Sequence, residues 1–141
     1  MEFTRRDEIG ATVSVCIFRD TVPTGMVVFC DFDTTDYPRA QTGLEEFLFL
    51  PGCLVVMGNS DKDIRVEVRV GGSNISGAQR VFEGVMTFHS GVLSISDPES
   101  PNVESLHLPR SGSWNVQVYL RSMPEMDEMY FIFDFDQWKG E

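Results

Sequence analysis

The sequence predicts an all-β fold, an antiparallel β-sandwich or jelly-roll-like barrel made by a single domain over residues 1–141. Three observations predict it: short apolar runs recur along the chain, two of them alternate strictly with polar residues, and turns rich in Gly and Pro separate them. No stretch of eleven or more residues has the spacing of an amphipathic helix, although Thr42–Leu48 could form a short one.

The clearest strand is Ser113–Arg121, where apolar and polar residues alternate from Trp114 onward. Period-two alternation gives a strand one dry face and one wet face. A polar loop containing Pro124 leads to a second run, Met129–Phe135, so these two strands are predicted to form an antiparallel hairpin. We expect Trp114 and its apolar neighbours to lie at the centre of the core.

The other predicted strands are short and separated by turn residues. They are Thr12–Arg19, Met26–Phe32, Leu44–Leu50, Cys53–Met57, Ile64–Val70, Val81–Phe88, Val92–Ile95 and Glu104–Leu108. The first two are expected to pair, because Asp20–Gly25 has turn chemistry. Pro51-Gly52 either turns a tight hairpin or breaks one crooked strand. The polar segment Asp33–Gly43 predicts a long surface loop, where function is often found.

The chain is strongly acidic, with 22 Asp and Glu against 11 Lys and Arg and a formal net charge of -11. Such a charge disfavours binding to nucleic acid or anionic membranes and speeds encounter with a basic partner. The competing interpretation is that the charge only keeps the protein in solution. No apolar run approaches the length of a membrane span and no signal segment is visible, so we expect a cytoplasmic protein.

Three cysteines, Cys16, Cys30 and Cys53, lie inside or beside apolar runs. An odd number cannot pair completely, and buried cysteines behave as small apolar side chains. We expect reduced thiols in a cytosolic protein.

The segment Val27–Thr35 is an apolar strand followed by Asp31-x-Asp33-x-Thr35. It resembles the first motif of haloacid-dehalogenase-type phosphotransferases. The resemblance implies a nucleophilic Asp31, an acid/base Asp33 and a magnesium ion. Those enzymes need an α/β fold and a later, positioned lysine, whereas this chain is predicted to be all β. A magnesium-dependent phosphotransferase is therefore the last of the functions considered.

Two carboxylate pairs, Asp31 with Asp33 and Asp134 with Asp136, could each contribute oxygens to Ca²⁺ or Mg²⁺. A hard cation needs six or more converging oxygens, and the chain has only two histidines for a softer metal. We expect neither a metal nor another cofactor, and no catalytic residue is assigned.

A wet row on the clearest strand suggests a different function. Asn115, Gln117, Tyr119 and Arg121 would lie on one face, and an aromatic ring among amides suits a sugar or another small polar ligand. A ligand-binding β-sandwich is therefore the alternative function, and an ordinary solvated face is the competing interpretation.

The layout from Asp61 onward resembles the competence protein J type of β-sandwich, a family of inhibitors of a DNA-entry nuclease. The similar segments are Ile64–Val70, Val81–Ile95, Leu106–Tyr119 and the closing strand after Glu128. The resemblance implies a small acidic protein that binds and silences a nuclease. The charge agrees, since nucleases have basic clefts for phosphates and carboxylates can imitate a row of phosphates.

We therefore expect a non-catalytic inhibitor or immunity-type protein whose partner is a nuclease or another basic enzyme. Two groups of carboxylates are the predicted partner-binding residues, and they would form one anionic rim if both lie at the same end of the sandwich. They are Asp33, Asp36, Glu45 and Glu46 in and after the long loop, and Glu125, Asp127 and Glu128 around the last hairpin turn.

Overall fold

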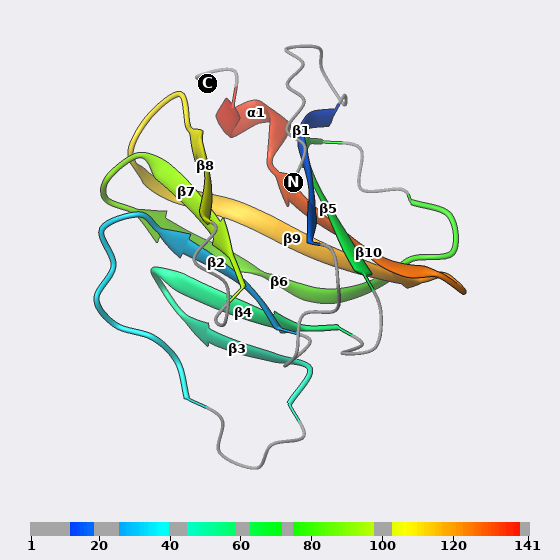
Figure 1. Ribbon diagram of the computed structural model, residues 1–141. Helices are drawn as coiled ribbons and strands as arrows, with labels where there is room; N and C mark the ends of the chain where they lie inside the picture. Colours follow the sequence, from blue (N-terminus) through cyan, green and yellow to red (C-terminus); the bar gives the residue numbers. More distant parts are fainter. Residues whose placement is uncertain are drawn as a thin grey trace.

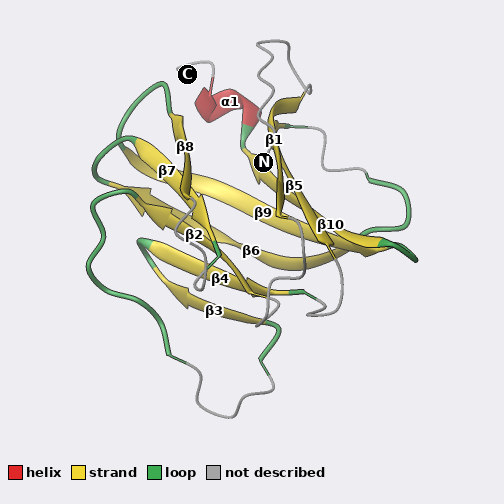
Figure 2. Cartoon of the chain, in the orientation of Figure 1, coloured by secondary structure: helices red, strands yellow, loops and turns green. Residues whose placement is uncertain are grey.

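The fold is a sandwich of two five-stranded β-sheets (Figures 1 and 2). The computed structural model describes residues 12–18, 26–39, 45–58, 63–71, 75–97 and 103–138. A single short helix, α1 (Phe135–Trp138), follows the last strand of this described part. The predicted all-β sandwich is confirmed.

The clearest strand of the sequence is an interior strand of the first sheet, one position away from its edge. The order of this sheet is β1 (Thr12–Phe18), β5 (Asp63–Val70), β10 (Met126–Phe133), β9 (Gly112–Ser122) and β6 (Gln79–Phe88). The predicted hairpin is confirmed, since β9 and β10 pair antiparallel. The pair β5 and β10 is parallel, which a hairpin-based prediction does not anticipate.

The second sheet is antiparallel throughout. Its order is β3 (Phe47–Leu50), β4 (Cys53–Met57), β2 (Met26–Asp31), β7 (Val92–Ser96) and β8 (Val103–His107). Leu50 lies opposite Cys53, so Pro51-Gly52 is a hairpin turn and not a break in one strand.

The expected pairing of the first two strands is wrong, because β1 and β2 belong to different sheets. β1 is an edge strand that pairs with β5, whereas β2 lies between β4 and β7. Residues 27–31 of β2 are all buried, so both faces of this strand are covered. A strand that is apolar on both faces favours a central position, and turn chemistry in the segment before it does not choose its partner.

The main core fills the space between the two sheets. Phe29 of β2 stacks on Phe131 of β10, with ring centroids 4.7 Å apart. Trp114 is fully buried, as predicted, and its ring meets Phe133 edge-on at 5.4 Å. The Trp138 ring of α1 packs 5.8 Å from Trp114. No helix in the described residues is long and apolar enough to cross a membrane.

A smaller apolar cluster includes two of the cysteines. Cys30 and Cys53 lie directly opposite each other on β2 and β4, with Cα atoms 4.2 Å apart, and form a disulfide. Both are buried beside Val28 and Val55. The expectation of reduced thiols is therefore wrong for this pair, because strand pairing brings together residues 23 positions apart in sequence. The side chain of Cys16 is outside the described part of the structure.

Gly84 makes room for an aromatic contact between the sheets. A Cβ at this position would lie 2.9 Å from Cζ of Phe82, whose ring is held by Phe47 at 5.2 Å and Phe49 at 4.9 Å. Gly84→Ala should lower the free energy of unfolding by about 1–3 kcal/mol, because the ring must move. Chemical denaturation measures this, and Val85→Ala at the half-exposed neighbouring position is the control, with a loss of about 0.5 kcal/mol or less.

Candidate partner-binding site

An acidic hollow lies at the end of the sandwich where the chain leaves β2. Its volume is about 590 Å³, and Asp31, Asp33 and Asp36 are among its lining residues. Thr87 near the end of β6 and His89 just after it also line the hollow, and the β3–β4 turn supplies further lining residues. The hollow therefore joins three segments that are distant in the sequence. We call it the acidic hollow below.

Asp31 connects the segments that surround the hollow through hydrogen bonds. It is only 4% exposed, and its Oδ1 accepts hydrogen bonds from the Ser90 N–H at 3.1 Å and the Ser90 hydroxyl at 2.5 Å. Its own N–H donates to the carbonyl of Gly52 at 2.8 Å. Ser90 lies in the turn that leads from β6 in one sheet to β7 in the other. Asp31 thus holds this end of the sandwich together, a structural role that differs from the nucleophile implied by the phosphotransferase motif.

The first residues of the long loop are held in place by backbone contacts. The N–H of Phe32 donates to the carbonyl of Val92 at 3.0 Å, and the N–H of Thr34 donates to that of Asp31 at 2.9 Å. The Thr34 hydroxyl donates to the carbonyl of Asp36 at 3.3 Å. Asp33 and Asp36 are exposed on this fixed segment. The predicted surface loop is therefore ordered where its carboxylates lie.

Two exposed aromatic side chains accompany these carboxylates. Phe32 is 59% exposed and Tyr37 is 58% exposed. The Tyr37 hydroxyl donates to the carbonyl of Thr34, a lining residue of the acidic hollow, at 3.5 Å. Exposed aromatic residues are enriched in protein interfaces. Sequence analysis missed both, although aromatic residues placed between carboxylates in a polar loop were an available signal.

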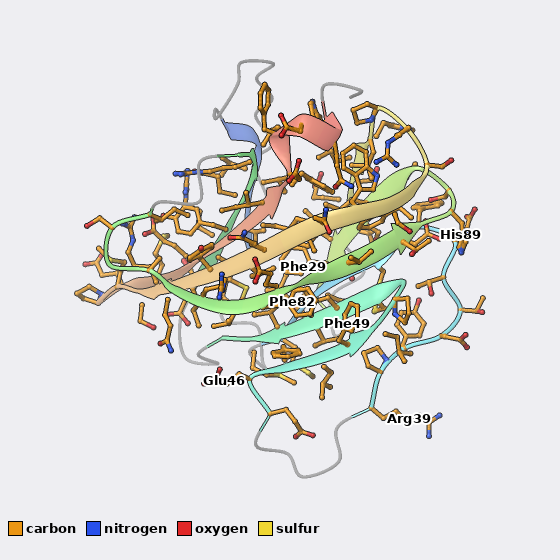
Figure 3. The ribbon with its side chains drawn as sticks, turned by 180° about the vertical axis from the view of Figure 1, so that it is seen from behind. Phe29, Arg39, Glu46, Phe49, Phe82 and His89 are labelled. Atoms are coloured by element: carbon orange, nitrogen blue, oxygen red, sulfur yellow. A yellow bond between two sulfur atoms is a disulfide. The ribbon has the colours of Figure 1, made fainter. Side chains whose placement is uncertain are left out.

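The second group of predicted carboxylates lies at the opposite end of the sandwich. Thr87, beside the hollow, pairs with Ser113 at the start of β9, whereas Ser122 at the end of β9 pairs with Asp127. The 11 residues of β9 separate the two ends by about 30 Å. Figure 1 shows the segment that follows β2 and the β9–β10 turn on opposite sides. In Figure 3, His89 and Glu46 mark the two ends.

The expected single rim is therefore not formed. Asp127 is 1% exposed, and Glu128 accepts hydrogen bonds from Arg121, so neither offers an open carboxylate. Glu46 and Glu125 are exposed and Glu45 is half-buried, all away from the acidic hollow. Only Asp33 and Asp36 of the seven predicted residues line the hollow.

The wet row predicted on β9 lies on the outer face of the first sheet and is tied into a network. The Tyr119 hydroxyl donates to Gln117 at 3.0 Å, and Arg121 donates to the Tyr130 hydroxyl at 2.8 Å. The hydrogen bond to Glu128 raises the pKa of Arg121, and burial raises the pKa of Tyr130. A hollow of about 430 Å³, lined in part by Asn115 and Gln117, opens on this sheet. This hollow lies beside two residues of the predicted wet row.

Charges on that face neutralise one another, unlike those at the acidic hollow. Four arginines there pair with glutamates: Arg65 and Arg69 with Glu67, Arg80 with Glu83, and Arg121 with Glu128. In the part of the chain that the structure describes, neither Asp33 nor Asp36 forms an ion pair. The acidic hollow therefore carries exposed negative charge that no described arginine or lysine neutralises.

In each of the two carboxylate pairs considered for metal binding, one aspartate accepts hydrogen bonds from protein groups. Asp31 binds Ser90, and Asp134 accepts a hydrogen bond from the N–H of Gln137 at 3.0 Å. Within the described ranges, no three His, Cys, Asp or Glu side chains are grouped so that they could hold a metal ion.

Comparison with known proteins identifies a structural neighbour. No protein-family model and no curated protein matches the sequence. The fold is similar to the crystal structure of ComJ, inhibitor of the DNA degrading activity of NucA, from Bacillus subtilis, with a TM-score of 0.71. The likeness covers 88% of this chain and 96% of that chain at 11% sequence identity. At this identity it shows the fold, so the fold implied by the resemblance to competence protein J is confirmed.

Proposed function

We propose that this chain, which has the fold of ComJ, is a non-catalytic protein that binds and inhibits a nuclease or another basic enzyme. ComJ is named as an inhibitor of a DNA-degrading activity, and 96% of its chain is covered by the likeness. The net charge of -11 supports the same kind of partner, because an acidic surface attracts a basic cleft over a long range.

The observation that carries the proposal is the open charge at the acidic hollow. Asp33 and Asp36 project from an ordered segment and are not engaged by a described arginine or lysine. A docking partner would therefore not have to break an internal ion pair to reach them. Two carboxylates on a fixed surface can occupy positions that a nuclease provides for phosphates.

The fold argues against the phosphotransferase function and leaves the ligand-binding alternative open. A haloacid-dehalogenase-type phosphotransferase requires an α/β fold, and this chain forms two β-sheets. Binding of a small polar ligand finds support in the hollow beside Asn115 and Gln117. It remains the alternative, with the acidic hollow left unexplained.

The proposal is tested by DNA degradation in an extract of the protein's own source. Adding the purified protein should remove at least about half of the metal-dependent activity, with saturation at a fixed molar ratio, because an inhibitor acts by stoichiometric binding. Degradation of plasmid DNA measures the loss. NucA serves as a second, purified enzyme for the same assay.

Heat-unfolded protein at the same concentration is the control for non-specific effects of an acidic chain. Full DNA degradation in the presence of a large excess of folded protein, in both assays, would reject the inhibitor proposal. The ligand-binding alternative would then become the better explanation of the fold.

A further inference from the structure

We infer that the acidic hollow is the contact site for the partner and that it receives an arginine side chain of a basic protein. The inference rests on the proposed function and names the chemistry of the contact. Its basis is the combination of a shaped hollow, three carboxylates with different exposures, and aromatic groups next to it.

Asp31 supplies the feature that points to a bound cation. Its carboxylate is nine-tenths buried and lines the hollow, and Ser90 occupies only Oδ1. Oδ2 accepts no hydrogen bond from any residue that the structure describes. This oxygen is not fully buried, so it is open to the hollow and can accept N–H groups that a ligand brings there.

The cation that fits is organic. The described residues contain no group of three metal-binding side chains, so the three aspartates do not converge as a metal site requires. A guanidinium has five N–H donors in a planar fork and can bridge carboxylates that are set apart. It can therefore offer donors to more than one of the three aspartates that line the hollow, whereas the ammonium of lysine is a point charge.

The surroundings favour a side chain delivered by a protein. Phe32 and Tyr37 give an exposed apolar area beside the hollow, which a free cation would not use. Aromatic residues of this kind carry much of the binding energy in protein interfaces, and a tyrosine face also attracts a guanidinium. The backbone hydrogen bonds of Phe32 and Thr34 fix the segment before binding, which lowers the entropic cost of association.

The hollow itself is tested with a small probe, N-acetyl-L-arginine methylamide. Amide NMR spectra of the protein should show shifts that saturate and that map to Gly52, Thr87 and His89. The matched citrulline compound, which is uncharged, should bind at least about tenfold more weakly, and the lysine compound should also bind more weakly. Equal binding of the citrulline compound, or shifts confined to other surfaces, would overturn the inference.

Two double variants distinguish the effect of this site on binding from the effect of the net charge. Asp33→Asn with Asp36→Asn should weaken probe binding at least about tenfold and slow association with the inhibited nuclease by a similar factor. Glu46→Gln with Glu125→Gln removes the same charge at the opposite end and should change either value by less than about threefold, through long-range attraction alone. An equal effect of both pairs would assign the binding to net charge and reject the site.

The outcomes distinguish this inference from the proposed function. Inhibition of a nuclease that is unchanged by Asp33→Asn with Asp36→Asn would leave the inhibitor function standing and reject the hollow as its contact site. Selective binding of the arginine probe without inhibition of any nuclease would support the hollow and reject the nuclease as partner. If the protein neither inhibits a nuclease nor binds the arginine probe, both the proposed function and the contact site are rejected.

Discussion

Replacing Trp114 by alanine is expected to lower the free energy of unfolding by about 3–5 kcal/mol, because a fully buried indole would leave a large cavity. Its ring contacts Phe133 and Trp138, and the guanidinium of Arg110 covers it at 4.3 Å. These neighbours come from different elements and cannot collapse together into the space. Chemical denaturation followed by circular dichroism measures the loss.

Trp114→Phe is the matched control for this change. The buried indole N–H of Trp114 has no hydrogen-bond partner among the described residues, so phenylalanine removes an unsatisfied donor while it keeps most of the apolar contact. We expect a loss of about 1–2 kcal/mol. A loss below about 1 kcal/mol for Trp114→Ala would contradict the placement of this strand face in the core.

The strands could be predicted because each of them carries its own pattern. In β9 the alternation from Trp114 to Arg121 identifies the buried face without knowledge of any partner. The local pattern of a strand does not specify which other strand it pairs with. β10 is buried at every position from Met129 to Phe133, a sign of a central strand, yet nothing in this run specifies that β5 lies beside it in parallel.

The candidate site could be predicted only in part for the same reason. Asp33 and Asp36 were recognised because a polar loop after a buried strand must lie on the surface. Whether Glu125 lies near them depends on the end of the sheet from which each loop leaves, and this follows from the strand order. The burial of Asp127 could not be predicted from the sequence either, because a carboxylate beside a hairpin turn normally faces water.

The Asp31 motif shows how a sequence string can mislead when its fold is different. In a phosphotransferase the aspartate after the strand must be open to its substrate, whereas Asp31 here bonds Ser90 across the end of the sandwich. The two positions are 59 residues apart in the chain, so the contact could not be seen from local sequence. The same placement turns Asp31 into a determinant of stability.

Asp31→Ala should therefore lower the free energy of unfolding by about 2–4 kcal/mol, because two hydrogen bonds to a buried, charged acceptor are lost together. Ser90→Ala removes the hydroxyl partner alone and should cost about 1–2 kcal/mol. If the two side chains act through one contact, the double variant should be less destabilised than the sum of the single variants by at least about 1 kcal/mol. Thermal and chemical denaturation of the four proteins provide this cycle. Strict additivity of the two changes would show that the contact between Asp31 and Ser90 does not hold this end of the sandwich together.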